Sequence, residues 1–401
     1  MPEAFPQRVA RLTAEAALFA GVAPDAVRLV RSPYRICPLG AHVDHQLGRV
    51  TGMALDRSLL LAFVPTPDGR VRLRSRDLGG EACFTVAEAA QVPREGWGRY
   101  AAGAVLALAS AGLPIRRGIA GVLEGSLPIG GLSSSAAVSI AYLLALETAN
   151  ELKVTPADNI ALEQYVENVH IGLNNGILDQ SVILLSARNR LLYLDCRDAA
   201  WELIDPPADM PEFGIVVAYS GLSESLVGTG YNQRVAECRA AAEELLLRSG
   251  LAVPERPVLR DVPVEAFEAH AGELAPLLAK RARHFFGEDG RVIAGREAWA
   301  SGDLAGFGRL INESGRSSIE NYECGSAELI TLYEALRETP GVYGARFSGA
   351  GFRGSCIGLC EPGAEARIRE AVDRAFPRKH PHVADRYAVH FCRSDNAAEV
   401  P

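Results

Sequence analysis

The sequence predicts an α+β protein of two domains, and three observations support this prediction. The chain has 401 residues, a length at which two domains are usual. Strand-like runs and helical runs occur in both halves of the chain. Pro206, Pro207 and Pro211 mark a candidate linker near the middle. We therefore expect one domain over residues 1–205 and a second over residues 206–401.

In the first domain, hydrophobic periodicity and turn residues predict the elements. Residues 5–20 repeat apolar side chains at helical spacing, and 100–111 form a helix of small residues. A further helix begins after Thr155, which is a good N-cap and is followed by Pro156 at the first helical position. The expected strands are 27–30, 50–55 and 59–64 on either side of a polar turn, 71–76, 82–86, 118–125 and 191–195.

More helix is expected in the second domain. A strand at 214–219 precedes a long helix at 231–248, which ends at Gly250. The remaining helical runs are 264–286, 291–301, 303–315, 326–338 and 364–376, and the remaining strands are 343–348, 357–359 and 387–391.

Composition excludes several classes of protein. A net charge of −8 without a basic tail argues against a nucleic-acid binder. No run of 18 uninterrupted apolar residues is present, so no membrane span is predicted. The eight cysteines form no CxxC pair, which favours reduced thiols in the cytoplasm over disulfides or a zinc site.

The stretch from 128 to 150 combines two glycines, three serines and a buried helix. Gly130 and Gly131 allow the backbone to approach a ligand closely. Ser133, Ser134 and Ser135 can cap the helix, whose free N–H groups and dipole form an anion site. No lysine follows the glycines, so the stretch is not a Walker A motif. It is either a phosphate-binding turn or an ordinary helix start.

Two other loops gather polar side chains. Residues 32–48 place Arg35, His42, Asp44 and His45 between strands, which indicates either a ligand site or a solvated connection. In the helix after Thr155, Glu163 and Glu167 are four residues apart and share one face. An asparagine- and glycine-rich turn follows at 170–180 and carries Asp179.

These stretches together resemble the motifs of the GHMP small-molecule kinases, and most closely those of the galactokinase family. YRICPLGAHVDH is similar to GRVNLIGEHTDY, and PIGGLSSSAA to PxGxGLSSSAS. ENVHIGLNNGILDQ is similar to ENxxxGxxxGxMDQ, and GAGFRG to GGGFGG. The first motif also resembles that of the galacturonokinase branch. The resemblance implies a ribosomal S5 domain 2-like N-terminal domain, a ferredoxin-like C-terminal domain, and an active site in the cleft between them.

The resemblance also implies a role for each matching residue. Asp179 would activate the sugar hydroxyl, Arg35 would steady Asp179 and the phosphoryl group, and Ser135 with Glu167 would hold Mg²⁺. The reaction would move a phosphoryl group from ATP to the anomeric C1 hydroxyl of a sugar. The implied sugar-binding positions are Ala41, His42, Asp44, Gly176 and Tyr231, and the implied nucleotide-binding positions are Gly130, Gly131, Leu132, Ser133, Ser134, Ser135, Ala136, Gly349 and Gly351.

Ala41 is the departure that bears on the substrate, because galactokinases carry glutamate at this position. Two like unit charges about 4 Å apart repel by about 4 kcal/mol at an effective dielectric of about 20. A glutamate at this position would therefore weaken the binding of a substrate carboxylate by about a thousandfold. Removing the glutamate therefore permits a uronic acid, and we expect D-galacturonate as the substrate. The alternative is that Ala41 only loosens the binding of galactose. His45, Tyr34 and Arg234 are candidates to bind the C6 carboxylate.

Two other function classes remain open. A sugar sensor would bind ATP and sugar without catalysis, but Arg35, Asp179 and the serine motif are all intact. Arg353, where galactokinases have glycine, could obstruct the phosphate turn or add a useful positive charge. A decarboxylase of the same superfamily fits less well, because the likeness to galactokinase extends beyond the shared loops. The expected partners are ATP and a small sugar or uronic acid, without nucleic acid or membrane, and we expect a monomer.

Overall fold

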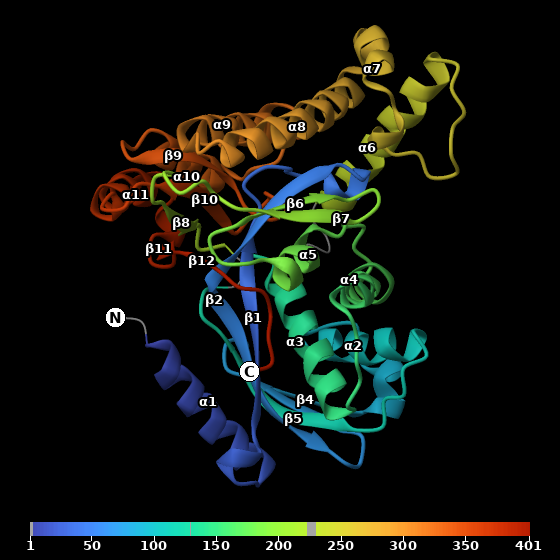
Figure 1. The fold of residues 1–401 in the computed structure, drawn as a ribbon, viewed down its shortest axis with the longest axis vertical. Helices are drawn as coiled ribbons and strands as arrows, with labels where there is room; N and C mark the ends of the chain where they lie inside the picture. The colour runs from blue at the N-terminus through green and yellow to red at the C-terminus, as the bar shows by residue number, and fades with distance from the viewer. Residues whose placement is uncertain (1–2, 129, 223–229) are drawn as a thin grey trace.

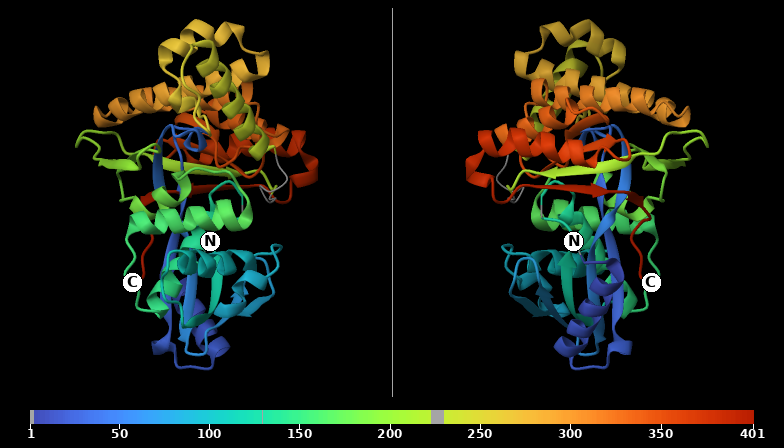
Figure 2. Two further views of the ribbon diagram at one scale, coloured as in Figure 1. Left: turned by 90° about the vertical axis from the view of Figure 1, so that its right-hand side faces the viewer. Right: turned by 90° about the vertical axis from the view of Figure 1, so that its left-hand side faces the viewer.

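The computed structural model describes residues 3–128, 130–222 and 230–401, and its strands form two separate sheets (Figure 1). The elements coloured blue to green surround an eight-stranded sheet, and those coloured yellow to red surround a four-stranded sheet. Figure 2 shows the same division from two sides. Ile129 of the glycine-serine motif lies outside the described residues.

The eight-stranded sheet has the strand order β4-β3-β5-β2-β6-β7, with β1 and β12 also paired to β2. All its pairings are antiparallel except that between β3 and β5. Its strands are β1 (Arg28–Ile36), β2 (Arg49–Thr66), β3 (Arg70–Ser75), β4 (Glu81–Thr85), β5 (Gly118–Gly125), β6 (Leu191–Asp195), β7 (Ala200–Ile204) and β12 (Ser394–Asp395). The helices of this half are α1 (Phe5–Ala20), α2 (Gly98–Ser110), α3 (Ser134–Ala149), α4 (Pro156–Gln164) and α5 (Leu178–Leu185).

The four-stranded sheet is antiparallel throughout, with the order β11-β8-β10-β9. Its strands are β8 (Gly214–Tyr219), β9 (Val342–Phe347), β10 (Ser355–Cys360) and β11 (Ala388–Cys392). The helices that accompany it are α6 (Tyr231–Arg248), α7 (Val264–His270), α8 (Pro276–Ala300), α9 (Leu304–Glu320), α10 (Ala327–Arg337) and α11 (Glu365–Lys379).

One apolar core joins the two halves. Ile140 of α3 belongs to the same buried cluster as Ile215 and Val217 of β8, Ile357 of β10 and Trp299 of α8. Side chains in this cluster are close to fully buried on both sides of the junction. Because a buried side chain the size of leucine is worth roughly 1.5–3 kcal/mol, this shared cluster fixes the two sheets relative to each other.

The change from one sheet to the other falls between β7 and β8, in the proline-containing segment. The chain later returns to the first sheet through β12, which pairs with Leu55 and Ala54 of β2. Figure 1 shows this red segment beside β1 and β2. The division at residues 205 and 206 stays a prediction.

Two predictions about the strands are wrong. The expected polar turn between 55 and 59 lies inside the single strand β2, and residues 32–36 belong to β1 rather than to a loop. Asp56 exchanges hydrogen bonds with the backbone of Arg393, and the Ser58 N–H donates to Ser126 Oγ at 2.8 Å. These polar residues therefore have partners within the sheet and need no turn.

A break predicted after residue 286 is also absent. Gly287 and Gly290 lie inside α8, which runs for 25 residues from Pro276. A glycine inside a helix costs only about 1 kcal/mol relative to alanine, and packing against the neighbouring helices α6 and α9 exceeds this cost. None of the helices in the described ranges is long and apolar enough to cross a bilayer.

The pair formed by Arg31 and Asp395 anchors β12, and breaking it should destabilise the protein. Both side chains are nearly buried, so Asp395→Ala would leave the Arg31 guanidinium with the longer contact to the exposed Glu399, at 3.4 Å. We expect a loss of about 3 kcal/mol in the free energy of unfolding, measured by chemical denaturation. Arg74→Ala, which breaks a half-exposed pair with Glu81, should cost less than about 1 kcal/mol. Equal losses would contradict this assignment.

Candidate active site

A cavity of about 380 Å³ opens where the two halves meet. It receives residues from β1, from the start of α3, from the segment around Glu167 and Asp179, and from the late glycine turn. The predicted site residues that line it are Arg35, His42, Asp44, Gly130, Gly131, Ser133, Ser134, Ser135, Glu167, Asp179, Tyr231 and Gly349. The predicted residues Ala41, Leu132, Ala136, Gly176 and Gly351 are buried and do not line the cavity, and their roles stay predictions.

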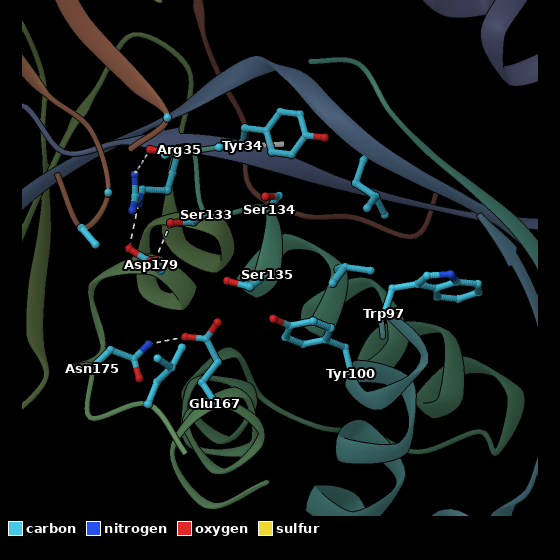
Figure 3. A pocket seen from close by; sticks show the side chains of 18 of the residues that line it. Tyr34, Arg35, Trp97, Tyr100, Ser133, Ser134, Ser135, Glu167, Asn175 and Asp179 are labelled. Carbon is cyan, nitrogen blue, oxygen red and sulfur yellow. Dashed lines mark hydrogen bonds and ion pairs between the residues drawn. The ribbon is translucent and has the colours of Figure 1, made fainter. Parts of the chain in front are cut away.

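Arg35 and Asp179 meet at one wall of the cavity (Figure 3). Arg35 Nε lies 2.8 Å from Asp179 Oδ1, and the Arg35 side chain is only 2% exposed. An irregularity between residues 33 and 35 shifts the register of β1 against β2 just before Arg35. Ser133 Oγ donates to the other oxygen, Asp179 Oδ2. Both carboxylate oxygens are therefore held, and the orientation of the Asp179 side chain is fixed.

The start of α3 is built differently from the prediction. Ser133 occupies the N-cap position with φ +55°, but its hydroxyl binds Asp179 instead of capping the helix. The prediction of a cap at Ser133 is therefore wrong, because Ser133 has left-handed backbone angles whereas a capping residue is normally extended. The N–H groups at the start of α3 consequently remain available for an anion, as a phosphate site requires.

Two glycine turns from distant parts of the chain touch at this point. A Cβ on Gly349 would lie 3.0 Å from Gly131 Cα, and one on Gly354 would lie 2.7 Å from the Gly130 carbonyl carbon. Gly131 and Gly349 both have positive φ, +75° and +67°. Only glycine satisfies both the backbone angle and the close contact. The late turn therefore closes directly over the turn that precedes α3.

Asp44 and His42 lie at the end of the cavity toward the C-terminal half. Asp44 Oδ2 accepts the N–H of Gly176 at 3.2 Å, and a Cβ on Gly176 would lie 2.5 Å from the Asp44 carbonyl carbon. Burial, followed by the charge of Asp179, raises the pKa of Asp44 to about 6. His42 stacks on Tyr322 with ring centroids 4.2 Å apart, and burial lowers its pKa well below the usual value.

Ala41 is buried, and α8 holds its backbone. Glu288 Oε1 accepts the N–H groups of Gly40 and Ala41, both at 2.9 Å. Burial alone would raise the pKa of Glu288, but Arg291 and the other nearby positive groups outweigh this and lower it to about 2. His284 Nε2 lies 2.8 Å from the Ala41 carbonyl oxygen, so this nitrogen carries the proton. The sequence did not identify Glu288 or His284.

The three candidates for binding a C6 carboxylate occupy different places. Tyr34 lines the cavity, whereas His45 and Arg234 do not. His45 Nε2 lies 3.1 Å from the hydroxyl of Tyr322, and Arg234 Nε donates to the Tyr322 carbonyl oxygen at 2.9 Å. His45 and Arg234 therefore hold the residue on which His42 stacks.

Ser135 and Glu167 offer hard oxygen ligands suited to Mg²⁺. Their side chains point into the same space in Figure 3. Glu167 Oε2 accepts from Asn175 Nδ2, while Glu167 Oε1 is buried without a hydrogen-bond partner. Burial, followed by the charge of Asp179, raises the pKa of Glu167 to about 7. A buried carboxylate oxygen without a partner fits a cation, so these residues suit the implied metal.

The other end of the cavity was not predicted from the sequence. Trp97 and Tyr100, at the start of α2, line it together with Asp77 and Arg99. Figure 3 shows Trp97 on the far side of Ser135 from Arg35. An aromatic ring beside charged and polar groups suits a flat heterocycle. No motif indicated these residues, because an isolated tryptophan is more often a packing residue.

Comparisons with known proteins agree with this architecture. Residues 99–187 match the model for the GHMP kinases N terminal domain, and residues 296–378 match the model described as GHMP kinases C terminal. Galacturonokinase of Arabidopsis thaliana is 49% identical over 397 residues, covering 93% of each chain. Galactokinase of Roseiflexus sp. is 33% identical over 382 residues, covering 95% of this chain and 94% of that protein.

A solved structure is similar over nearly the whole chain. The crystal structure of Lactococcus lactis galactokinase complexed with galactose has a TM-score of 0.88 and 28% identity, covering 98% of this chain and 99% of that one. The chain therefore belongs to the GHMP kinase superfamily and, within it, to the galactokinase family. The prediction of a two-domain GHMP kinase fold is confirmed.

Replacing Glu288 tests whether its contact with the backbone at Ala41 supports sugar binding. In Glu288→Gln the charged acceptor becomes a neutral amide, and charge-assisted bonds are about twice as strong as neutral ones. We expect the KM for the sugar to rise about tenfold, with the KM for ATP changed less than about twofold. Glu297→Gln, on an exposed turn of the same helix, is the control. Equal rises in both KM values would indicate general destabilisation instead.

Proposed function

We propose that the protein is an ATP-dependent sugar kinase that phosphorylates the anomeric C1 hydroxyl of D-galacturonate, giving galacturonate 1-phosphate. The observation that carries the proposal is the contact between Arg35 and Asp179 beside the uncapped start of α3. A base, a cation and an anion site lie around one cavity there. This combination is what phosphoryl transfer to a hydroxyl requires.

In the proposed mechanism, Asp179 Oδ1 or Oδ2 accepts the proton of the C1 hydroxyl as the hydroxyl oxygen attacks the γ-phosphorus. The bond between the γ-phosphorus and the bridging oxygen breaks, and ADP leaves with the electron pair. Arg35 orients Asp179 and offsets negative charge on the transferring group. The backbone N–H groups at the start of α3 bind the phosphates.

Mg²⁺, held by Ser135 and Glu167, would offset the negative charge of the ATP phosphates. Asn175 orients Glu167 by donating to one of its oxygens. At the other end, Trp97 and Tyr100 provide the surface on which the nucleotide base lies. The glycine turn at 349–354 excludes water from the phosphates, since its backbone rests directly on Gly130 and Gly131.

Support for galacturonate comes from Ala41 and from the relative that is 49% identical. Glu288 and His284 hold the backbone at Ala41 on both its N–H and its carbonyl oxygen, and the alanine side chain carries no charge. A substrate carboxylate at C6 would then meet no opposing charge from this residue. Galactose remains the alternative substrate, as the galactokinases at 31–34% identity indicate.

Replacing Asp179 tests the catalytic assignment and the sensor alternative together. Asp179→Asn keeps the shape of the side chain and removes the base, so kcat should fall by about 10²–10⁴ while the Kd for ATP changes less than about threefold. Asp209→Asn, at an exposed position, is the control. A wild-type protein that binds ATP but releases no ADP with any hexose or uronate would instead be a sensor.

Replacing Ala41 tests the substrate. Ala41→Glu adds a charge that repels a uronate, and Ala41→Gln adds nearly the same volume without the charge. We expect the ratio of kcat/KM for galacturonate to that for galactose to fall by about a hundredfold or more in the Glu variant, and far less in the Gln variant. ADP release measured with both sugars provides the data. If the wild type turns over galactose faster than galacturonate, the proposed substrate is wrong.

We also propose that the enzyme is a cytoplasmic monomer. All eight cysteines are free thiols, and burial is the first cause of the raised pKa values of Cys37, Cys238, Cys324 and Cys356. Such thiols are protonated and unreactive at neutral pH, which suits a reducing compartment.

A further inference from the structure

Glu163 is a buried carboxylate that the proposed mechanism does not use. It lies in the last turn of α4, its side chain is fully buried, and neither carboxylate oxygen has a hydrogen-bond partner. A buried polar group without a partner costs several kcal/mol unless something satisfies it, and for a charged group the cost is larger. The position of Glu163 therefore needs an explanation.

Glu163 lies beside Glu167, which lines the cavity. The two are four residues apart, and α4 continues into a π-helix, Tyr165–Ile171, that carries Glu167. A π-helix has a wider turn than an α-helix and occurs most often at functional sites. Side chains four residues apart share one face and are neighbours there.

Three carboxylate oxygens in this pair are buried without a hydrogen bond of normal geometry: both oxygens of Glu163 and Oε1 of Glu167. The Ser135 hydroxyl is close enough to Glu167 to lower its pKa. The groups whose charges act on Glu163 are Glu167 and Asp179, and both are acidic. Burial, followed by the charge of Glu167, raises the pKa of Glu163 well above its usual value. Arg35 lowers the pKa of Glu167, but its guanidinium is paired with Asp179. One small dication would supply the positive charge that Glu163 lacks and would satisfy all three oxygens.

We propose that Glu163 contributes a carboxylate oxygen to the divalent cation that Glu167 and Ser135 would hold. The inference rests on the proposed function and adds a second carboxylate to its metal site. Two carboxylates, a hydroxyl and phosphate oxygens form a donor set of the kind that Mg²⁺ takes in kinases. Among the residues that the structure describes, no group of three or more His, Cys, Asp or Glu side chains could hold a metal. The nucleotide phosphates would supply the remaining ligands.

A second carboxylate has a consequence for the order of binding. With Glu167 alone, a dication would carry net positive charge until ATP arrived. With Glu163 and Glu167 both ionised, the protein neutralises the dication by itself. The enzyme should therefore bind the cation without nucleotide, which gives a readout independent of catalysis.

The test is a titration of the full-length, nucleotide-free protein with Mn²⁺, with free Mn²⁺ measured by electron paramagnetic resonance. We expect saturable binding of Mn²⁺ by the wild type. We expect the Mn²⁺ affinity of Glu163→Gln to be at least about tenfold weaker, because losing even a residue that only supports a metal ligand lowers metal affinity by about 10–100-fold. Glu147→Gln is the matched control. Glu147 is also buried, has one unpartnered oxygen and a pKa raised by burial to about 7, but belongs to α3 and hydrogen-bonds Asn159.

Unchanged Mn²⁺ affinity in Glu163→Gln would overturn the inference, since a protonated, purely structural Glu163 is well replaced by glutamine. Absence of saturable binding by the wild type would overturn it as well. If Glu163→Gln does not fold, Glu163→Asp and Glu163→Asn form a second pair, and equal affinities in that pair would overturn the inference.

Failure of the proposed function gives a different pattern. Wild-type protein that releases no ADP with either sugar refutes the kinase, whatever the Mn²⁺ result. Wild-type protein that releases ADP, together with weak Mn²⁺ binding in Glu167→Gln and unchanged binding in Glu163→Gln, refutes only the role of Glu163.

Discussion

The contact between Arg35 and Asp179 is the interaction on which the rest of the site depends. These residues are 144 positions apart, on β1 and α5, which pack against each other and against α3. Arg35 is almost fully buried, so removal of the carboxylate would leave a desolvated charge. Ser133 donates its hydroxyl to the same carboxylate and makes no side-chain cap, so the N–H groups at the start of α3 are available for an anion.

Close packing of backbone against backbone governs the junction between the halves. Gly130 and Gly131 precede α3 and touch Gly349 and Gly354, which precede β10. Side chains would hold these turns apart, so the N-terminal and C-terminal halves share one phosphate-binding surface only because both turns are glycine. The apolar cluster around Ile140 and Trp299 then holds the two halves in this arrangement.

The sequence predicted much of the fold where local signals were strong. The strands at 118–125, 191–195 and 214–219 and the helix at 231–248 have the bounds that periodicity and turn residues indicated. The polar turn within β2 was wrong because Asp56 and Ser58 find partners from Arg393 and Ser126. Such partners lie far along the chain, so no local pattern could reveal them.

The candidate site shows the same limit. The family motifs identified Arg35 and Asp179, which the structure brings together. The sequence did not reveal Glu288 and His284 because they contact the backbone of Gly40 and Ala41. A contact to backbone atoms does not depend on the partner's side chain and so produces no sequence motif. Glu163 was visible as a neighbour of Glu167, but its burial without a partner is a property of the packed structure alone.

The pairing of β12 with β2 has a consequence for biosynthesis. Arg31 and Asp395 are 364 residues apart, and the second sheet with its helices is encoded between them. As the chain leaves the ribosome, the N-terminal sheet can collapse early but cannot acquire this strand until the whole C-terminal half has been translated. The N-terminal half therefore completes its fold only after the C-terminal end of the chain has been synthesised. A nascent chain that stalls before β12 would expose an unpaired stretch of β2, which chaperones would have to shield.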